Sequence, residues 1–212
     1  MTTTDTTTKT ARLFVQNGRR TRNTEEQTAY LRAYLLKSPA CPPEIVETCA
    51  EEMAQQIAGE DCILIPVPDS KGDTRKNLWL ANRIMRNDRT GEAQVKDILT
   101  RADWSESQCQ RHRAGLPPQT PEQLNFSVTP HKPFTLRKVY FVDNVTTSGA
   151  TIQACHDALG FGTGLCYAEA MRRQSRSVSP QKPQRDCTAI SSASPVNTRT
   201  AEWIAAQSRT HS

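Results

Sequence analysis

The sequence Val139-Tyr-Phe-Val-Asp-Asn-Val-Thr-Thr-Ser-Gly-Ala-Thr151 decides the fold of this chain. Its first four residues are apolar, and such a short run of β-branched and aromatic residues predicts a buried parallel strand. Asp143 and Asn144 follow at the carboxyl end of that strand, where open α/β sheets hold their ligands. Gly149 permits a close approach of the backbone, and apolar residues at helical spacing begin just after it. Backbone N–H groups and hydroxyls therefore converge at the start of a helix, which predicts an anion site.

The same stretch resembles the phosphoribosyl pyrophosphate (PRPP) loop of the type I phosphoribosyltransferases. That loop consists of a hydrophobic strand, two acidic residues, a hydrophobic residue, two small residues, then Thr or Ser, Gly, any residue, and Thr or Ser. The chain departs from this pattern at Asn144, which can hydrogen-bond a ribose hydroxyl but carries no charge. The alternative is an ordinary strand, turn and helix rich in Thr and Ser. The order of the elements favours the family.

A second stretch, Ile63 to Val67, predicts a strand that runs into a turn-forming, cation-bearing loop. The resemblance implies that this loop cradles the pyrophosphate of PRPP, with Lys71 as the charge partner and Pro68, Asp69 and Ser70 as further contacts. The Val-Pro pair, the basic loop and Asn77-Leu-Trp-Leu-Ala81 resemble the ComF branch, competence-associated proteins with a phosphoribosyltransferase fold. The chain lacks that branch's paired N-terminal cysteines. A simple turn at the end of the strand is the alternative for the prolines.

The predicted fold is α/β, with a parallel doubly wound sheet of the type I phosphoribosyltransferase kind and a helical N-terminal segment. Strands are expected near residues 63, 95–100, 139 and 164–171, with a short strand-like segment at 124–128. Helices are expected to start at Thr24, at Pro42 or Pro43, and at Thr74. Right-handed crossovers and the family topology imply the strand order second, first, third, fourth. The two loops would then flank one crevice.

Length and charge suggest one domain with two extensions. We expect a disordered N-terminal segment at 1–23, a phosphoribosyltransferase-like domain at 24–171, and a basic Ser/Pro-rich tail at 172–212 with a short helix. Residues 1–171 hold 20 Lys+Arg and 20 Asp+Glu, while residues 172–212 hold 7 and 2, so the tail carries the whole net charge of +5. The tail is read as a solvated extension or as a contact for nucleic acid or a protein partner.

The cysteines and the absence of long apolar runs indicate a cytoplasmic protein without membrane contact. No apolar run approaches the ~18 residues of a spanning helix, and the N-terminus has no signal-peptide core. Seven cysteines without a Cys-x-x-Cys pair indicate reduced thiols. Cys109 and His112 have a metal-like spacing, but without a second pair nearby we expect no zinc site.

The long segment from Arg101 to Gln123 is expected to be irregular, and such segments in compact domains are functional or disordered. The resemblance implies a loop that closes over PRPP, which makes Arg101, Arg111 and Arg113 candidates for phosphate contacts. A solvated basic face is the alternative.

The resemblance implies an enzyme that transfers phosphoribosyl from PRPP to a nitrogen acceptor, with Mg²⁺ and release of pyrophosphate. Asp143 and Asn144 would bind the ribose, and Lys71 would stabilise the leaving group. The 5-phosphate would be held by Thr146, Thr147, Ser148, Gly149, Ala150 and Thr151. The sequence does not identify the acceptor.

A non-catalytic function is the alternative, favoured by Asn144 and the basic tail. The chain would then be a phosphoribosyltransferase-fold nucleotide sensor, or a partner subunit in a DNA-handling or mobile-element defence complex. The ligand in either case is PRPP or a nucleoside monophosphate. The oligomeric state is left open, with a homodimer among the possibilities.

Overall fold

A computed structural model of the chain describes residues 7–15, 24–89, 91–101, 110–111, 114–117, 119–130, 134 and 137–171. Its helices are α1 (Thr24–Leu35), α2 (Pro43–Ala54), α3 (Arg75–Asn87) and α5 (Ala150–Leu159), with 3-10 helices η2 (Gln55–Ile57) and η3 (Pro121–Leu124). Its strands are β1 (Thr8–Val15), β2 (Cys62–Pro66), β3 (Gln94–Val95), β4 (Leu99–Arg101), β5 (Phe126–Val128), β6 (Lys138–Thr146) and β7 (Thr163–Met171).

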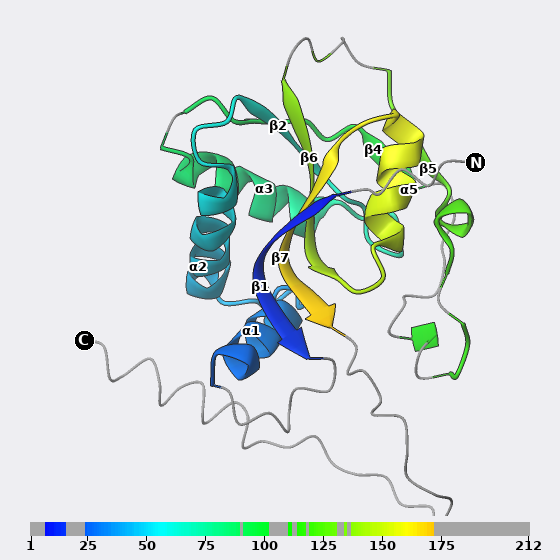
Figure 1. Cartoon of the computed structure of the whole chain (residues 1–212), viewed down its shortest axis with the longest axis horizontal. Helices are drawn as coiled ribbons and strands as arrows, with labels where there is room; N and C mark the ends of the chain where they lie inside the picture. The colour runs from blue at the N-terminus through cyan, green and yellow to red at the C-terminus, as the bar shows by residue number, and fades with distance from the viewer. Residues whose placement is uncertain are drawn as a thin grey trace, which may run out of the picture. The chain divides into compact units, whose positions relative to one another are not determined.

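A parallel sheet of five strands forms the centre of the fold, in the order β1-β7-β6-β2-β3 (Figure 1). The four strands expected from the sequence therefore lie in the predicted order. The order reverses between β2 and β6, because β3 adds to one side of β2 and β7 adds to the opposite side of β6. In open α/β sheets, such a reversal is where ligands bind.

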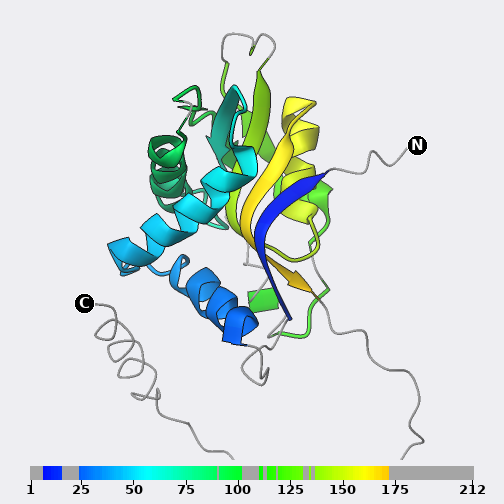
Figure 2. The same cartoon turned by 60° about the vertical axis from the view of Figure 1, so that its left-hand side comes forward.

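Helices cover both faces of the sheet, as predicted for an α/β fold. Figure 2 shows α1, α2 and α3 on one side and α5 on the other. Because side chains alternate along a strand, neighbouring residues of β6 enter different cores. Tyr140 and Val142 pack with α1, α2 and α3, whereas Val139 and Phe141 pack with α5 and the β4–β5 ribbon.

The helix starts expected at Thr24 and Pro43 are confirmed, and α3 begins at Arg75, one residue after the expected Thr74. Proline at the first helical position of α2 fits because its missing N–H has no partner within the helix. The C-terminus of α2 passes into η2 before Gly59, which adopts a φ of 81°.

The prediction that residues 1–23 are disordered is wrong over Thr8–Val15. These residues form β1, which pairs with β7 from Thr8–Gly164 to Val15–Met171. The segment lacks the large apolar residues that usually mark a strand, but β-branched threonines suit a pleated strand. Ion pairs from Lys9 to Glu60 and from Arg12 to Glu52, at 2.9 and 2.7 Å, hold it in place. These are long-range contacts that local sequence does not reveal.

The strand expected at 95–100 is divided into two. Gln94–Val95 pairs with β2, and Lys96 N donates to Leu64 O at 2.9 Å as the chain leaves the sheet. Leu99–Arg101 then pairs with β5 in an antiparallel ribbon, so the segment expected at 124–128 is a strand over Phe126–Val128. This ribbon packs with α5 over one face of the sheet.

The tail expected at 172–212, with its short helix, lies outside the described residues, as do Cys109, His112 and Arg113. Among the residues described, no helix combines the length and hydrophobicity that crossing a membrane requires.

Candidate functional site

The loop after β6 has the geometry expected of an anion site. Strand β6 extends to Thr146, beyond the apolar run, and α5 begins at Ala150 after a bend. Gly149 turns the chain at a φ of 74°, a conformation that glycine adopts without strain. The first turn of α5 has no acidic residue and its N-cap, Gly149, has no side chain, although Ser148 Oγ accepts a long hydrogen bond from Ala150 N at 3.5 Å. The positive end of the helix dipole therefore faces the bend without a carboxylate of its own helix to neutralise it.

The predicted phosphate residues differ in what they can offer a ligand. Thr147 and Ser148 are exposed, and Thr146 and Thr151 are partly exposed. Ala150 is 9 % exposed and packs against Leu124 and Ala154, so it presents only its backbone.

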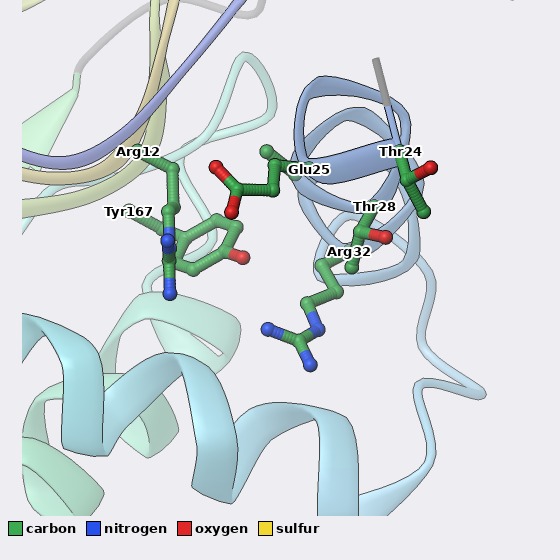
Figure 3. A pocket seen from close by; sticks show the side chains of 7 residues that line it. Arg12, Thr24, Glu25, Thr28, Arg32 and Tyr167 are labelled. Atoms are coloured by element: carbon green, nitrogen blue, oxygen red, sulfur yellow. The ribbon is translucent and has the colours of Figure 1, made fainter. Parts of the chain in front are cut away.

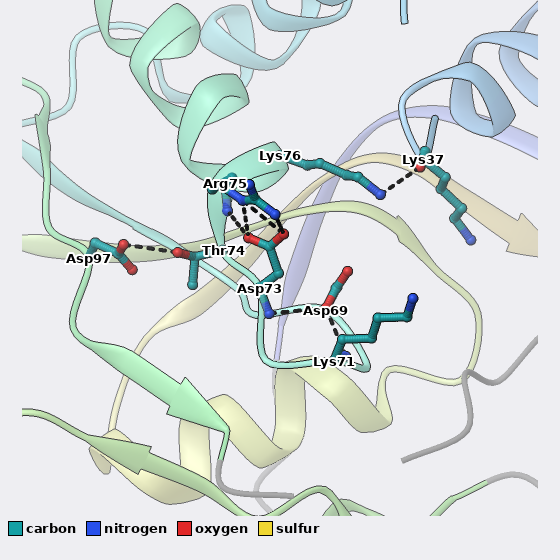
Figure 4. Close-up of polar contacts among 8 residues, drawn as sticks. All are labelled: Lys37, Asp69, Lys71, Asp73, Thr74, Arg75, Lys76 and Asp97. Atoms are coloured by element: carbon teal, nitrogen blue, oxygen red, sulfur yellow. Dashed lines mark hydrogen bonds and ion pairs between the residues drawn. The ribbon is translucent and has the colours of Figure 1, made fainter. Parts of the chain in front are cut away.

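The loop after β2 is shaped by Asp69 (Figure 4). Its Oδ1 accepts hydrogen bonds from the backbone N of Lys71 and Asp73 at 2.8 and 3.1 Å. Its backbone also bonds to Asp73 and Gly72. The main role of Asp69 is therefore to stabilise the turn. The sequence predicted a direct substrate contact for this residue and not this structural role. Pro68 is buried, Ser70 is partly exposed, and Lys71 is exposed.

The start of α3 adds charged groups beside this loop. The guanidinium of Arg75 forms a bidentate pair with Asp73, at 3.0 and 2.7 Å, which neutralises its charge. Lys76 Nζ donates to Lys37 O at 2.9 Å and so fastens the α1–α2 connection to α3 (Figure 4). By contrast, the ammonium of Lys71 has no ion pair among the described residues and extends away from the turn.

The two loops leave neighbouring strands side by side. Pro66 pairs with Val142 in the register of β2 and β6, and Val67 N donates to Val142 O at 3.0 Å. The side chain of Asn77 bridges the end of β2 and the inside of β6, donating to Val67 O at 2.7 Å and to Asp143 Oδ1 at 3.3 Å. The structure thus brings together the Pro68–Lys71 loop and the Asp143–Thr151 loop, as the predicted strand order requires.

Asp143 and Asn144 lie at this junction. Asp143 Oδ1 accepts a second hydrogen bond from Asn144 N at 2.7 Å. Burial raises the pKa of Asp143 above its usual value, although the Asn144 N–H, the charge of Lys37 and the Asn77 amide oppose the rise. Asn144 lines a small pocket with Lys76, Asn77 and Trp79 of α3. The α1–α2 connection contributes Leu36, Ser38, Pro39 and Cys41 to the same pocket. Asn77 belongs to the segment Asn77-Leu-Trp-Leu-Ala81, but its place beside Asp143 was not predicted from the sequence.

Three arginines were predicted to contact phosphate. Arg113 lies outside the described residues, and of the other two only Arg101 lies at the site. Its Nη1 is 3.5 Å from Asp69 O, and its guanidinium lies over the Phe126 ring, 5.6 Å from the centroid. Burial lowers the pKa of Arg101, and the nearby Asp69 opposes this. Arg111 Nε instead donates to Pro117 O at 2.9 Å, within its own segment, and has no hydrogen bond to either loop among the described residues.

A second recess lies between β1, β7 and α1 (Figure 3). The Glu52 carboxylate binds Arg12 at 2.7 and 2.9 Å and Arg32 at 3.0 Å, and Glu25 lies at the rim near Arg12. Burial raises the pKa of Tyr167 in the same recess, so its hydroxyl stays protonated. The charges of Arg12 and Arg32 are matched by those of Glu25 and Glu52. We interpret this cluster as a structural contact that joins β1, α1 and α2.

No model of a known protein family and no curated protein matches the chain. Within the described residues, no three His, Cys, Asp or Glu side chains come together in a way that could hold a metal ion.

Proposed function

We propose that this protein binds PRPP with Mg²⁺ and transfers its phosphoribosyl group to a nitrogen acceptor, releasing pyrophosphate. The observation that carries the proposal is the pair of loops at the reversal of strand order. One loop offers a helix N-terminus and hydroxyls, and the other offers an exposed lysine. Asp143 lies between them. A sugar phosphorylated at both ends needs donors or a cation for each phosphoryl group and an acceptor for its hydroxyls, and these two loops supply them.

Each loop would hold one end of the substrate. Backbone N–H groups at Ser148 to Thr151 and the hydroxyls of Thr147 and Ser148 would bind the 5-phosphate and fix the reacting carbon in place. The ammonium of Lys71 would pair with the pyrophosphate as negative charge builds on it. Arg101 holds the Asp69 loop in shape, so its contribution would be to position Lys71.

The carboxylate of Asp143 would accept from a ribose hydroxyl and offset the positive charge that develops on the sugar ring. Asn144 offers an amide at the neighbouring position but no second charge. Mg²⁺, when bound, supplies charge neutralisation for the leaving pyrophosphate. Oxygens of the bound substrate would hold the ion, since oxygen is the ligand type that Mg²⁺ prefers.

A binding protein without turnover is the second candidate, and Asn144 is the observation that favours it. With a single carboxylate at the ribose, less of the developing ring charge would be offset. Pyrophosphate release from PRPP, measured with a pool of bases and amines, separates the two candidates. Binding without release would favour a PRPP or nucleotide sensor, and DNA association that salt weakens and deletion of 172–212 abolishes would favour a partner subunit.

Replacing Asp143 tests the site itself. We expect Asp143→Ala to abolish PRPP binding in calorimetry with Mg²⁺, because the carboxylate would no longer accept from the sugar. Asp157→Ala is the matched control, since Asp157 lies on α5, is exposed, and among the described residues contacts Gln153 and His156 of its own helix. Near wild-type affinity of Asp143→Ala would remove this loop from the proposed site.

A further inference from the structure

Asn77 is a buried amide between the two central strands. It lies in the first turn of α3 and is 7 % exposed. The carbonyl of Val67 and Oδ1 of Asp143 both face its Nδ2, at 2.7 and 3.3 Å. A carbonyl and a carboxylate only accept, so the NH₂ end of the amide must face them, and its two hydrogens are enough for both bonds. One side chain therefore connects the end of β2 to Asp143 within β6.

The two oxygens of Asp143 have different surroundings. Oδ1 accepts from the side chain of Asn77 and from the backbone of Asn144. Among the described residues, no hydrogen bond reaches Oδ2. Within the described part of the chain, both hydrogen bonds thus hold the carboxylate by Oδ1. Oδ2 can accept a hydrogen bond from a bound ligand.

We propose that Asn77 is a positioning residue, which holds the Asp143 carboxylate so that Oδ2 accepts from a hydroxyl of the bound sugar. The part of this inference that concerns the sugar rests on the proposed function. The part that concerns the carboxylate does not, because it follows from the two bonds of Asn77. A leucine at this position would keep the bulk and lose both donors. An aspartate would keep the shape and place a second carboxylate beside the first.

Titratable groups from three elements lie near Asp143, and they are Lys37, Cys155 and Cys166. Lys37, in the connection after α1, favours the charged form. Cys155 on α5 and Cys166 on β7 lie on the other side, and burial, together with the charge of Asp143, raises their pKa values. These thiols stay neutral, so they do not compete for the proton near neutral pH. Loss of the Asn77 donor should therefore raise the pKa of Asp143 and move ligand binding to higher pH.

The experiment follows the carboxyl carbon of Asp143 by NMR during a pH titration of the full chain labelled with ¹³C-aspartate. Asp143→Asn identifies the signal. We expect the titration midpoint to rise in Asn77→Leu and to rise further in Asn77→Asp, where two carboxylates share the site. Asn82→Leu is the matched control on the same helix, because Asn82 Nδ2 donates to Leu78 O at 2.8 Å and not to Asp143. This control should leave the midpoint unchanged.

PRPP binding with Mg²⁺ provides the second measurement. We expect affinity at neutral pH to fall about tenfold or more in Asn77→Leu, the usual effect of losing a hydrogen bond to a charged group. The loss should diminish as pH rises, whereas a purely structural defect would weaken binding equally at every pH. Asn82→Leu should bind as the wild type does.

The wild-type chain offers a readout that does not depend on a variant folding. The side-chain NH₂ signals of Asn77 should shift with the same midpoint as the Asp143 carboxyl. Absence of that coupling, or an unchanged Asp143 midpoint in a folded Asn77 variant, would overturn the inference. If the coupling is present but the wild type binds no PRPP, the proposed function fails and the positioning of the carboxylate stands.

Discussion

At the scale of single residues, the Glu60 carboxylate contacts more charged side chains than any carboxylate of the candidate site does among the described residues. Its carboxylate accepts from Tyr140 and Lys9 and pairs with Lys138 at 3.1 Å. Burial alone would raise the pKa of Glu60, but hydrogen bonds from Tyr140, Lys9 and Lys138 outweigh it and lower the pKa to about 2. These contacts link β1, the start of β2 and β6, at the end of the sheet opposite the loops.

Because the pKa of Glu60 is lower in the folded chain than in the unfolded chain, its contribution to stability is complete above the unfolded value. The contribution is lost as pH falls from about 4.5 towards about 2. We expect Glu60→Gln to lower the free energy of unfolding at neutral pH by about 1 to 2 kcal/mol, after allowance for solvent screening. Urea unfolding between pH 7 and pH 2.5 measures this. A difference from the wild type that stayed constant over the whole range would contradict the assignment.

At the scale of elements, the turn between α5 and β7 sets how closely the helix packs on the sheet. Gly160 caps α5 with a φ of 88°, and Gly162 adopts a φ of 122° just before β7. A Cβ on Gly162 would lie 2.5 Å from Cε2 of Phe141, whose side chain is fully buried. A Cβ on Gly160 would meet nothing within 4 Å. An alanine at Gly160 would therefore introduce backbone strain alone, whereas an alanine at Gly162 would add steric overlap with Phe141.

We expect Gly160→Ala to cost about 1 kcal/mol of stability, since alanine is strained at positive φ. Gly162→Ala should cost about 2 to 4 kcal/mol, because the Phe141 ring must also move within a packed core. Chemical denaturation of both variants gives the comparison. Equal losses would show that the ring moves aside freely and that the packing between β6 and α5 is loose.

At the scale of the whole molecule, the candidate site is made by elements distant in the sequence. Asn77 and Asp143 are 66 residues apart, so a ligand at their junction should bind only the folded chain. Such a ligand stabilises the native state by about 2.7 kcal/mol at a hundred times its Kd.

For a chain of this size, that stabilisation should raise Tm by roughly 5 to 10 °C. We expect PRPP with Mg²⁺ to do so in a thermal-shift experiment that also includes nucleoside monophosphates. Asp143→Ala should show no shift with PRPP. A shift of the same size in that variant would place the binding elsewhere on the molecule.

Local sequence was enough to predict β6, the bend at Gly149, α5 and the strand at Ile63, because each depends on neighbouring residues. Strand order followed from chirality and the family topology. The edge strand at Thr8–Val15 was missed, since its polar residues are held by ion pairs to Glu52 and Glu60 far along the chain.

The sequence by itself determined which residues are candidates to bind a phosphate and a sugar, because that prediction rests on side-chain type and spacing. Only the tertiary structure decided how they work together. In the folded chain Arg101 contacts the Asp69 loop, Arg111 bonds within its own segment, and Asn77 donates to Asp143. The physical reason is that hydrogen bonds and burial act across space, and the distance between two residues in space is set by how the sheet is assembled.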